Sequence, residues 1–487
     1  MFETSLLLFI KSLAINIFLP LIPWLLFVWI FWWKKFQWIL LYLLSWFLWV
    51  WIVAVSLFNI QFIHFGVGLP EYFVILLLLL AIFVAKILVK KQSIKQYFSL
   101  LSFDFVSFSA LKKSYFELSR VQKIFTITWI IFSLGFVVTI FTYRASFPTY
   151  ADDSFGNRNS PAINVYQDWW VKLFWDKDQI LARWRIGYPF YIPMYKALIA
   201  DAFWSFNDIY LNTWQLLVFV GLLLFSLYIT WKKTKNIFYT VLPSVLICWL
   251  PLVFFHSVEG YMDLPLAIYA VFAIWTLFEF VESNYEDISM FSLFVVLWWL
   301  IVNIKNEWLV IYLSAIVLSF IFLLVVKKDF QLFFKKIFKK SSSLLGILAS
   351  LVYIYLPFLI VRLVHGLWLN PVSSPVATST WFVSHTEIFS VFGPIFFKED
   401  NYNVALLILL VILILNWKNI KNIKHNKNLF WIAPLILFVL FTLTFLFTEN
   451  YQWALNQTTI NRVYTMCFVV LFSFIWILFA DNEHGKD

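Results

Sequence analysis

Residues Ile124–Tyr143 read IFTITWIIFSLGFVVTIFTY, a run of 20 residues that contains no charged side chain. An α-helix rises about 1.5 Å per residue, so a run of this length crosses the hydrocarbon core of a bilayer, which is about 30 Å thick. Comparable apolar runs recur along the chain. The sequence therefore predicts an all-α polytopic membrane protein with about thirteen transmembrane helices. The predicted spans lie near residues 12–33, 36–58, 70–89, 124–143, 211–230, 237–256, 264–281, 288–304, 308–326, 342–362, 403–416, 429–447 and 463–480.

The composition supports a membrane protein. Of the 487 residues, 63% are hydrophobic and only 13% are charged, and the mean hydropathy is +0.85, whereas a soluble domain carries about a quarter charged residues. The net charge of +10 comes largely from lysines in short loops between apolar runs, where they set topology, so we expect a lipid bilayer and no nucleic acid as partner. The N-terminal run ends in lysines without a small-residue cleavage site, which indicates a retained helix.

The basic residues also predict which loops face the cytoplasm. Most of the 36 lysines and arginines fall in one alternate set of loops, which the positive-inside rule assigns to the cytoplasm. Three long segments then lie outside, at 144–210, 363–402 and 448–462. We divide the chain into residues 1–123 (N-terminal extra helices and a basic cytoplasmic loop), 124–345 (a module with the long first outer loop) and 346–487 (C-terminal helices).

An acidic pair opens the first outer loop, in the stretch Tyr150–Asn157, which reads YADDSFGN. One interpretation of Asp152 and Asp153 is a general base that takes a proton from an acceptor hydroxyl. A second is a ligand for a divalent metal, because hard cations prefer carboxylates. A third is a solvated turn in which an aspartate caps a short helix.

Two further turns carry charges at the predicted outer face. Residues 258–265 read VEGYMDLP; a turn with Gly260 at its tip and Asp263 as a helix N-cap explains most of them but not Glu259. Residues 305–307 read KNE, and Lys305 and Glu307 are costly at a helix end unless they are paired, functional or reach the interface.

Basic residues on the outer side oppose the positive-inside tendency, which favours a function for some of them. Arginine binds phosphate through a bidentate fork, and Arg185 and Arg462 are candidates. Arg185 precedes Tyr188 in an aromatic stretch with two prolines, after which residues 194–206 could form an amphipathic helix in the interface. The six histidines and two cysteines show no zinc-site spacing, and the 11 glycines form no nucleotide-binding loop.

The order of these motifs resembles the bacterial membrane glycosyltransferases of the GT-C fold, the group similar to protein O-mannosyltransferases and lipid A aminoarabinose transferases, and most of all its family-39-like branch. The shared pattern is an aspartate that opens the first outer loop, the Tyr188–Pro189 dipeptide, the turn Tyr261–Ala267 and the turn Lys305–Glu307. The resemblance covers about residues 124–320. The chain departs from the branch at residues 157–161, which read NRNSP where a tryptophan is common, and in having two aspartates where many members have one.

The resemblance implies a GT-C-like bundle and a hexosyltransferase-type activity at the outer face of a bacterial inner (cytoplasmic) membrane. The donor would be a polyprenyl-phosphate-linked sugar, and the acceptor is unknown. Asp153 or Asp152 would deprotonate the acceptor hydroxyl, which attacks the anomeric carbon with inversion. Lys305, Arg185 and Arg462 would stabilise the leaving phosphate, and the residues that orient sugar or acceptor would be Glu259, Asp263, Glu307 and Tyr188. No cofactor is firmly implied, and a divalent metal stays an alternative.

Two other functions fit parts of the sequence. A transporter or flippase of lipid-linked glycans would show internal repeats and charges near the middle of the bilayer, and we find no repeat. An O-antigen ligase or polymerase would carry an arginine-rich outer loop with a histidine, for which His365 and His385 are candidates.

Overall fold

The structure is a computed structural model in which the larger part of the chain can be described. The described residues are 2–31, 50, 52–63, 66–90, 107–148, 158–169, 171, 173, 190–304, 306–338, 341–366, 384–397, 402, 406–407, 410–411, 414, 429–447, 451–455 and 457–475. Every regular element within these ranges is helical, which confirms the predicted all-α class.

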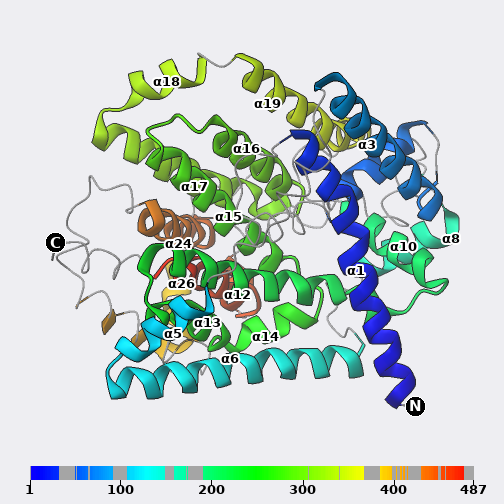
Figure 1. The fold of residues 1–487 in the computed structure, drawn as a ribbon. Helices are drawn as coiled ribbons and strands as arrows, with labels where there is room; N and C mark the ends of the chain where they lie inside the picture. Colours follow the sequence, from blue (N-terminus) through cyan, green and yellow to red (C-terminus); the bar gives the residue numbers. More distant parts are fainter. Residues whose placement is uncertain are drawn as a thin grey trace.

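The helices follow one another in a long series of chain reversals (Figure 1). Their bounds are α1 Phe2–Phe31, η1 Gln61–Ile63, α3 Leu69–Lys90, α5 Phe108–Glu117, α6 Arg120–Ser146, α8 Ser160–Asp168, α10 Tyr191–Phe203, α11 Asp208–Leu211, α12 Thr213–Thr234, α13 Ile237–Cys248, α14 Pro251–Val258, α15 Asp263–Glu282, α16 Ile288–Val302, α17 Asn306–Lys327, α18 Phe330–Phe338, α19 Ser341–Ile354, α20 Leu356–Val364, η3 Thr386–Ile388, α21 Phe389–Phe397, α24 Leu429–Phe447, α25 Tyr451–Leu455 and α26 Thr458–Ser473.

Several of these helices can cross a membrane by length and composition. Within the described part of the chain, four are long and apolar enough, and six are if each of two bent pairs counts as one span. The four are Leu69–Val89, Arg120–Ser146, Asp208–Thr234 and Asp263–Glu282. Shorter apolar helices of 10–17 residues accompany them.

Two predicted spans are broken where a proline interrupts the helix. The run at 237–256 forms α13 and α14, which meet at an angle of 74°, because Pro251 has no N–H to donate and pushes Leu250 into an extended conformation (φ −79°, ψ 110°). The run at 342–362 forms α19 and α20, bent by 42° just before Pro357. Hydropathy alone does not register the lost hydrogen bonds.

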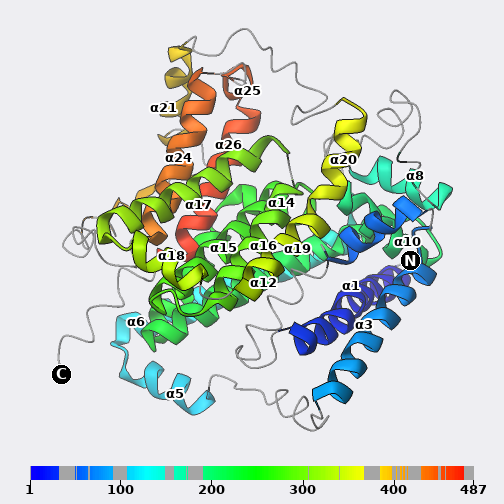
Figure 2. The same cartoon turned by 90° about the horizontal axis from the view of Figure 1, so that it is seen from above.

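Helix α15 lies in the middle of the bundle. It packs against α12, α16, α17, α24 and α26, and nearly all of its residues are buried, as expected for a helix that is apolar on every side. Helices α3 and α6 lie at the edges (Figures 1 and 2) and expose most of their apolar residues, which is the arrangement of helices that face lipid.

The N-terminal helices share one hydrophobic core with the rest of the chain. Helix α1 packs against α3, α6 and α12, and Ser12 donates a hydrogen bond to the Tyr210 carbonyl (2.9 Å). The helix expected at 194–206 is α10, which begins at Tyr191. It is buried on all sides over residues 191–200 instead of presenting a polar face to the interface.

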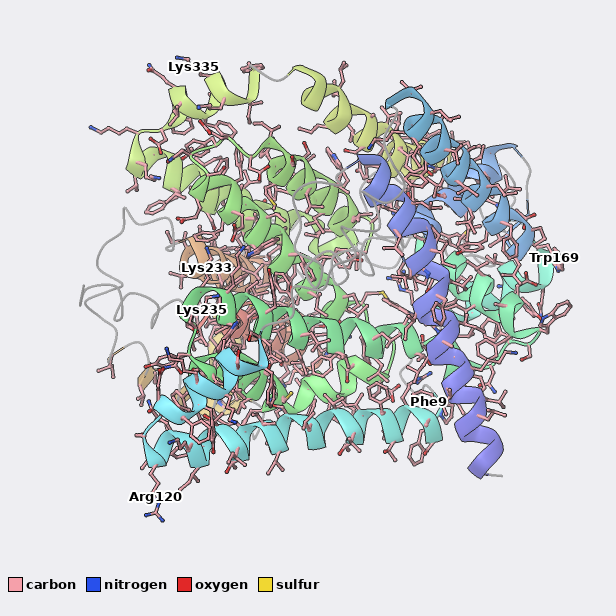
Figure 3. All side chains as sticks on the ribbon, viewed as in Figure 1. Phe9, Arg120, Trp169, Lys233, Lys235 and Lys335 are labelled. Carbon is pink, nitrogen blue, oxygen red and sulfur yellow. The ribbon has the colours of Figure 1, made fainter. Side chains whose placement is uncertain are left out.

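The bundle has two chemically different ends. Figure 3 shows Arg120, Lys233, Lys235 and Lys335 on one side of the molecule, with Trp169 on the other. We call the first the lysine-rich end. Since α6 rises about 1.5 Å per residue, its other terminus at Arg144 is roughly 35 Å from Arg120, a distance close to the thickness of a bilayer core. We call this the Arg144 end, and the candidate site lies there.

Candidate functional site

The site is built around the turn that joins α14 to α15. Glu259 closes α14 and donates its N–H to the Phe255 carbonyl (2.8 Å). Gly260 then takes a φ of 81°, a left-handed conformation that glycine adopts without a steric cost. Asp263 is the first residue of α15, not the predicted N-cap. Glu259 and Asp263 are both buried, with 6% and 4% of their surface exposed, so their carboxylates need partners.

Arg462 is the main partner of Asp263. It lies near the start of α26, and its Nη2 and Nε donate to the same oxygen, Oδ2, at 2.6 and 3.2 Å. The guanidinium carbon is 4.2 Å from the centre of the Tyr261 ring, a cation–π contact. His256 Nδ1 lies 3.9 Å from Asp263 Oδ2. The structure therefore joins two predicted site residues, Asp263 and Arg462, that are 199 positions apart.

A glutamine that sequence reasoning missed is hydrogen-bonded to the backbone of the turn between α14 and α15. Gln215, which is fully buried in α12, donates from Nε2 to the His256 carbonyl (3.1 Å) and to the Tyr261 carbonyl. Both carbonyls belong to residues that surround Asp263. The signal in the sequence was an amide inside the apolar run 211–230, whose other amide, Asn212, lies at its very start; a buried polar group there needs a partner.

The end of α6 contacts the other side of the turn. Tyr143 Oη donates to Glu259 Oε1 at 3.5 Å. The adjacent Arg144 is fully buried and donates to the Val258 carbonyl from Nη1 (3.0 Å). Its other nitrogens donate to the carbonyls of Ile209 (Nε, 3.0 Å) and Asp208 (Nη2). Sequence reasoning did not single out Arg144, although an arginine that ends an uncharged run of 20 residues was a usable signal.

A second polar cluster lies beside the first. Lys196 Nζ donates to Asn159 Oδ1 (2.6 Å), and Asn159 Nδ2 donates to Asp208 Oδ1. Lys196 and Asn159 have no exposed surface. Burial lowers the pKa of Lys196 to about 7; Asp208 opposes this shift, and the positive charges of Arg158 and Arg144 add to it.

Arg158 connects this second cluster to the turn between α16 and α17. It is 4% exposed, and its Nη2 donates to the Ile304 carbonyl at 3.4 Å. Ile304 directly precedes Lys305. The described residues on the two sides of the acidic pair thus contact both charged turns: Tyr143 and Arg144 reach the turn at 258–259, and Arg158 reaches the turn at 304.

Several predicted site residues lie outside the described residues. These are Asp152, Asp153, Arg185, Tyr188 and Lys305. Glu307 lies in the first turn of α17, and its side chain is not described. The structure therefore brings together Glu259, Asp263 and Arg462 and leaves the other assignments as predictions.

The metal and histidine alternatives can be examined in the described ranges only. In those ranges no three His, Cys, Asp or Glu side chains are grouped in a way that could hold a metal ion. His365 Nε2 lies 2.7 Å from the Leu173 carbonyl, and the His385 ring stacks on Tyr451 with centroids 3.6 Å apart. Neither histidine contacts Asp263 or Arg462.

Comparison with known proteins gives no relatives. No model of a protein family matches the chain, and neither a curated protein nor a solved structure matches it.

Proposed function

We propose that this chain is a membrane glycosyltransferase with a GT-C-like bundle of about thirteen transmembrane helices, and that it transfers a sugar from a polyprenyl phosphate to an acceptor hydroxyl. One observation carries the proposal: two carboxylates of one turn, Glu259 and Asp263, are buried, and Asp263 is paired with the cation Arg462. This turn lies beside Arg144, at the Arg144 end of the bundle. Of the described flanks of the acidic pair, Tyr143 contacts Glu259 and Arg158 contacts the turn that precedes Lys305. Acids to orient hydroxyl groups and a cation for a phosphate are the groups that this transfer needs.

The reaction has a simple balance of bonds and charge. Asp153 or Asp152 takes the proton of the acceptor hydroxyl, and the oxygen attacks the anomeric carbon. The bond from that carbon to the phosphate oxygen breaks, its electron pair stays on the phosphate, and the configuration inverts. Lys305, Arg185 and Arg462 stabilise the leaving phosphate. Glu259, Asp263, Glu307 and Tyr188 orient the sugar and the acceptor.

The charge distribution supports the proposed location. The positive-inside rule assigns the lysine-rich end to the cytoplasm, so the Arg144 end faces outward from a bacterial inner membrane. Nucleotide sugars are not available on that face, so the donor reaches the site through the bilayer. In our proposal, Arg462 exchanges its contact with Asp263 for one with the donor phosphate.

The decisive experiment profiles envelope glycans in a deletion strain that carries wild type, Asp152→Asn, Asp153→Asn or Asp287→Asn. Asp287 lies at the lysine-rich end, between α15 and α16, and serves as the control. We expect the control to restore the glycan and at least one of the other variants to lose it, while polyprenyl-phosphate sugar accumulates on the outer face. Normal glycan with both Asp152→Asn and Asp153→Asn, at wild-type protein level, would refute the proposal. Accumulation on the cytoplasmic face would support a flippase instead.

A further inference from the structure

Helix α18, at the lysine-rich end, packs on the bundle with one of its faces. Phe333 and Ile337 are its buried residues. The Phe333 ring contacts Phe320 of α17, with centroids 5.2 Å apart, and Phe291 of α16, with centroids 5.9 Å apart. Both contacts have the edge-to-face geometry that aromatic rings prefer. This face holds α18 against two helices of the bundle, so its other faces keep a defined direction.

A second face of α18 is aromatic and exposed. Phe330, Phe334 and Phe338 follow one another at intervals of four residues, so their side chains lie along one side of the helix. They are 37%, 49% and 66% exposed, and the rings of Phe334 and Phe338 are stacked with centroids 6.0 Å apart. We call these three residues the phenylalanine stripe. A contiguous apolar surface of this kind marks a contact with lipid or with another apolar partner.

The phenylalanine stripe continues a surface that faces lipid. Two residues link α17 to α18, and two link α18 to α19. Both neighbours expose apolar residues: Leu318, Ile321, Phe322 and Val325 on α17, and Leu345, Leu348 and Val352 on α19. Helix α19 begins a bent pair that is apolar enough to span a membrane, and Figure 1 shows it with α18 along the upper edge of the molecule. The stripe thus lies where the lipid-facing surface reaches the lysine-rich end.

Lysines lie beside the phenylalanine stripe. Residues 327–340 read KKDFQLFFKKIFKK, with six lysines and one aspartate. Lys327 lies 3.4 Å from Asp329 and Lys336 lies 2.7 Å from Glu286, whereas Lys328 and Lys335 are exposed. Lys335 directly follows Phe334 and so lies about 100° further around the helix. An apolar stripe flanked by lysines is the pattern of a helix that lies in the membrane interface and attracts anionic lipids.

We propose that α18 is an interfacial helix that binds anionic phospholipids in the leaflet at the lysine-rich end. The phenylalanine stripe enters the boundary between headgroups and acyl chains, and Lys328 and Lys335 contact the lipid phosphates. This site lies at the opposite end of the bundle from the Arg144 end. It does not depend on the proposed glycosyl transfer, so each can fail without the other.

The first test measures lipid affinity. Native mass spectrometry of the full-length protein in detergent, titrated with phosphatidylglycerol or with phosphatidylcholine, gives an apparent Kd for each lipid. We expect wild type to bind phosphatidylglycerol more tightly. The double variant Lys328→Gln with Lys335→Gln should weaken that binding on the order of tenfold, because each lysine near an anionic surface contributes about fivefold. Binding of phosphatidylcholine should not change.

The matched control removes the same charge from the same end of the molecule. Lys232 and Lys235 are exposed there but lie outside α18, so Lys232→Gln with Lys235→Gln should weaken phosphatidylglycerol binding by less than about twofold. Equal weakening in the two double variants would show a general charge effect and overturn the proposal. Equal wild-type affinity for the two lipids would also overturn it. Free glycerol phosphate that binds as tightly as phosphatidylglycerol would identify a soluble anion as the ligand, against the proposal.

The second test measures where α18 lies. A nitroxide is attached to Phe334→Cys or Gln331→Cys in vesicles that contain phosphatidylglycerol; the native Cys248 and Cys467 are buried. We expect oxygen, which concentrates in lipid, to relax the label at 334 more strongly than a water-soluble nickel complex does. The exposed position 331, next to the stripe, should show the reverse. Dominant relaxation by nickel at both positions would place the stripe in water and overturn the proposal in favour of a soluble protein partner.

Discussion

Arg462 donates two hydrogen bonds to one oxygen of Asp263, at 2.6 and 3.2 Å, and so joins the last described helix to the first turn of the central helix α15. The Asp263 side chain is 5% exposed and that of Arg462 is 19% exposed. A buried charge without a counter-charge lowers the stability of the folded protein. Removal of one partner of a buried ion pair therefore destabilises the protein much more than removal of both.

We expect Arg462→Gln to destabilise the protein by about 3 kcal/mol, because a buried carboxylate loses its cation. The double variant Arg462→Gln with Asp263→Asn should lose much less, since no unpaired charge is left. Thermal unfolding in detergent, followed by tryptophan fluorescence, measures both. The control is Lys233→Gln, which breaks the partly exposed pair of Lys233 and Glu279 (3.5 Å) and should cost less than about 1 kcal/mol. Equal losses for Arg462→Gln and the double variant would contradict this account.

Glu259→Gln tests the charge of the second buried carboxylate without changing its shape. Glutamine keeps an oxygen that can accept from Tyr143 Oη, which lies 3.5 Å from Glu259 Oε1, so we expect the change at this contact to cost less than about 1 kcal/mol of stability. The carboxylate is proposed to orient a sugar or acceptor hydroxyl, so transfer should fall about tenfold or more in kcat/KM. Glu286→Gln, at the lysine-rich end, should leave transfer unchanged. Similar activity for both variants would remove Glu259 from the site.

The all-α class and the positions of several helices were predictable because membrane spans depend on local composition. The predicted run 429–447 coincides with α24, and the run 264–281 with α15 to within a residue or two. The breaks before Pro251 and Pro357 were missed, because a hydropathy average counts apolar side chains and ignores the backbone N–H that proline lacks.

The site was predictable only in part, because its contacts depend on how distant helices pack together. The sequence identified Asp263 and Arg462 separately, by residue type and by their positions at helix ends. Their pairing depends on the packing of α26 against α15, which no local pattern encodes. Arg144 and Gln215 were missed because their partners are backbone carbonyls. Every residue has a backbone carbonyl, so the sequence does not show which of them a side chain will contact. The acidic pair lies outside the described residues, and its role stays a prediction.

Two glycines should respond in opposite ways to alanine. Gly260 has a φ of 81°, so Gly260→Ala should cost about 1–2 kcal/mol and displace the turn between Glu259 and Asp263. Gly135 lies inside α6, and a Cβ added there would meet nothing within 4 Å. Gly135→Ala should therefore be neutral or stabilise by up to about 1 kcal/mol, as helix propensity dictates. Unfolding midpoints of the two variants give the comparison, and a midpoint for Gly260→Ala at or above wild type would contradict the strained turn.

Lys196 should make stability depend on pH in the alkaline range. Its pKa is about 7 in the folded protein, against an ordinary value of 10.5. Between these values the unfolded chain binds more protons than the folded one, so the free energy of unfolding rises with pH, by up to about 1.4 kcal/mol per pH unit. Below pH 7 the group is protonated in both states and adds no slope.

Lys196→Met should flatten the rise between pH 7 and 10, and Lys232→Met, at an exposed position of the lysine-rich end, should preserve it. Unfolding midpoints across that range provide the measurement. If wild type and Lys196→Met change in parallel, another group titrates, and Lys196 is then not the buried cation whose burial lowers its pKa.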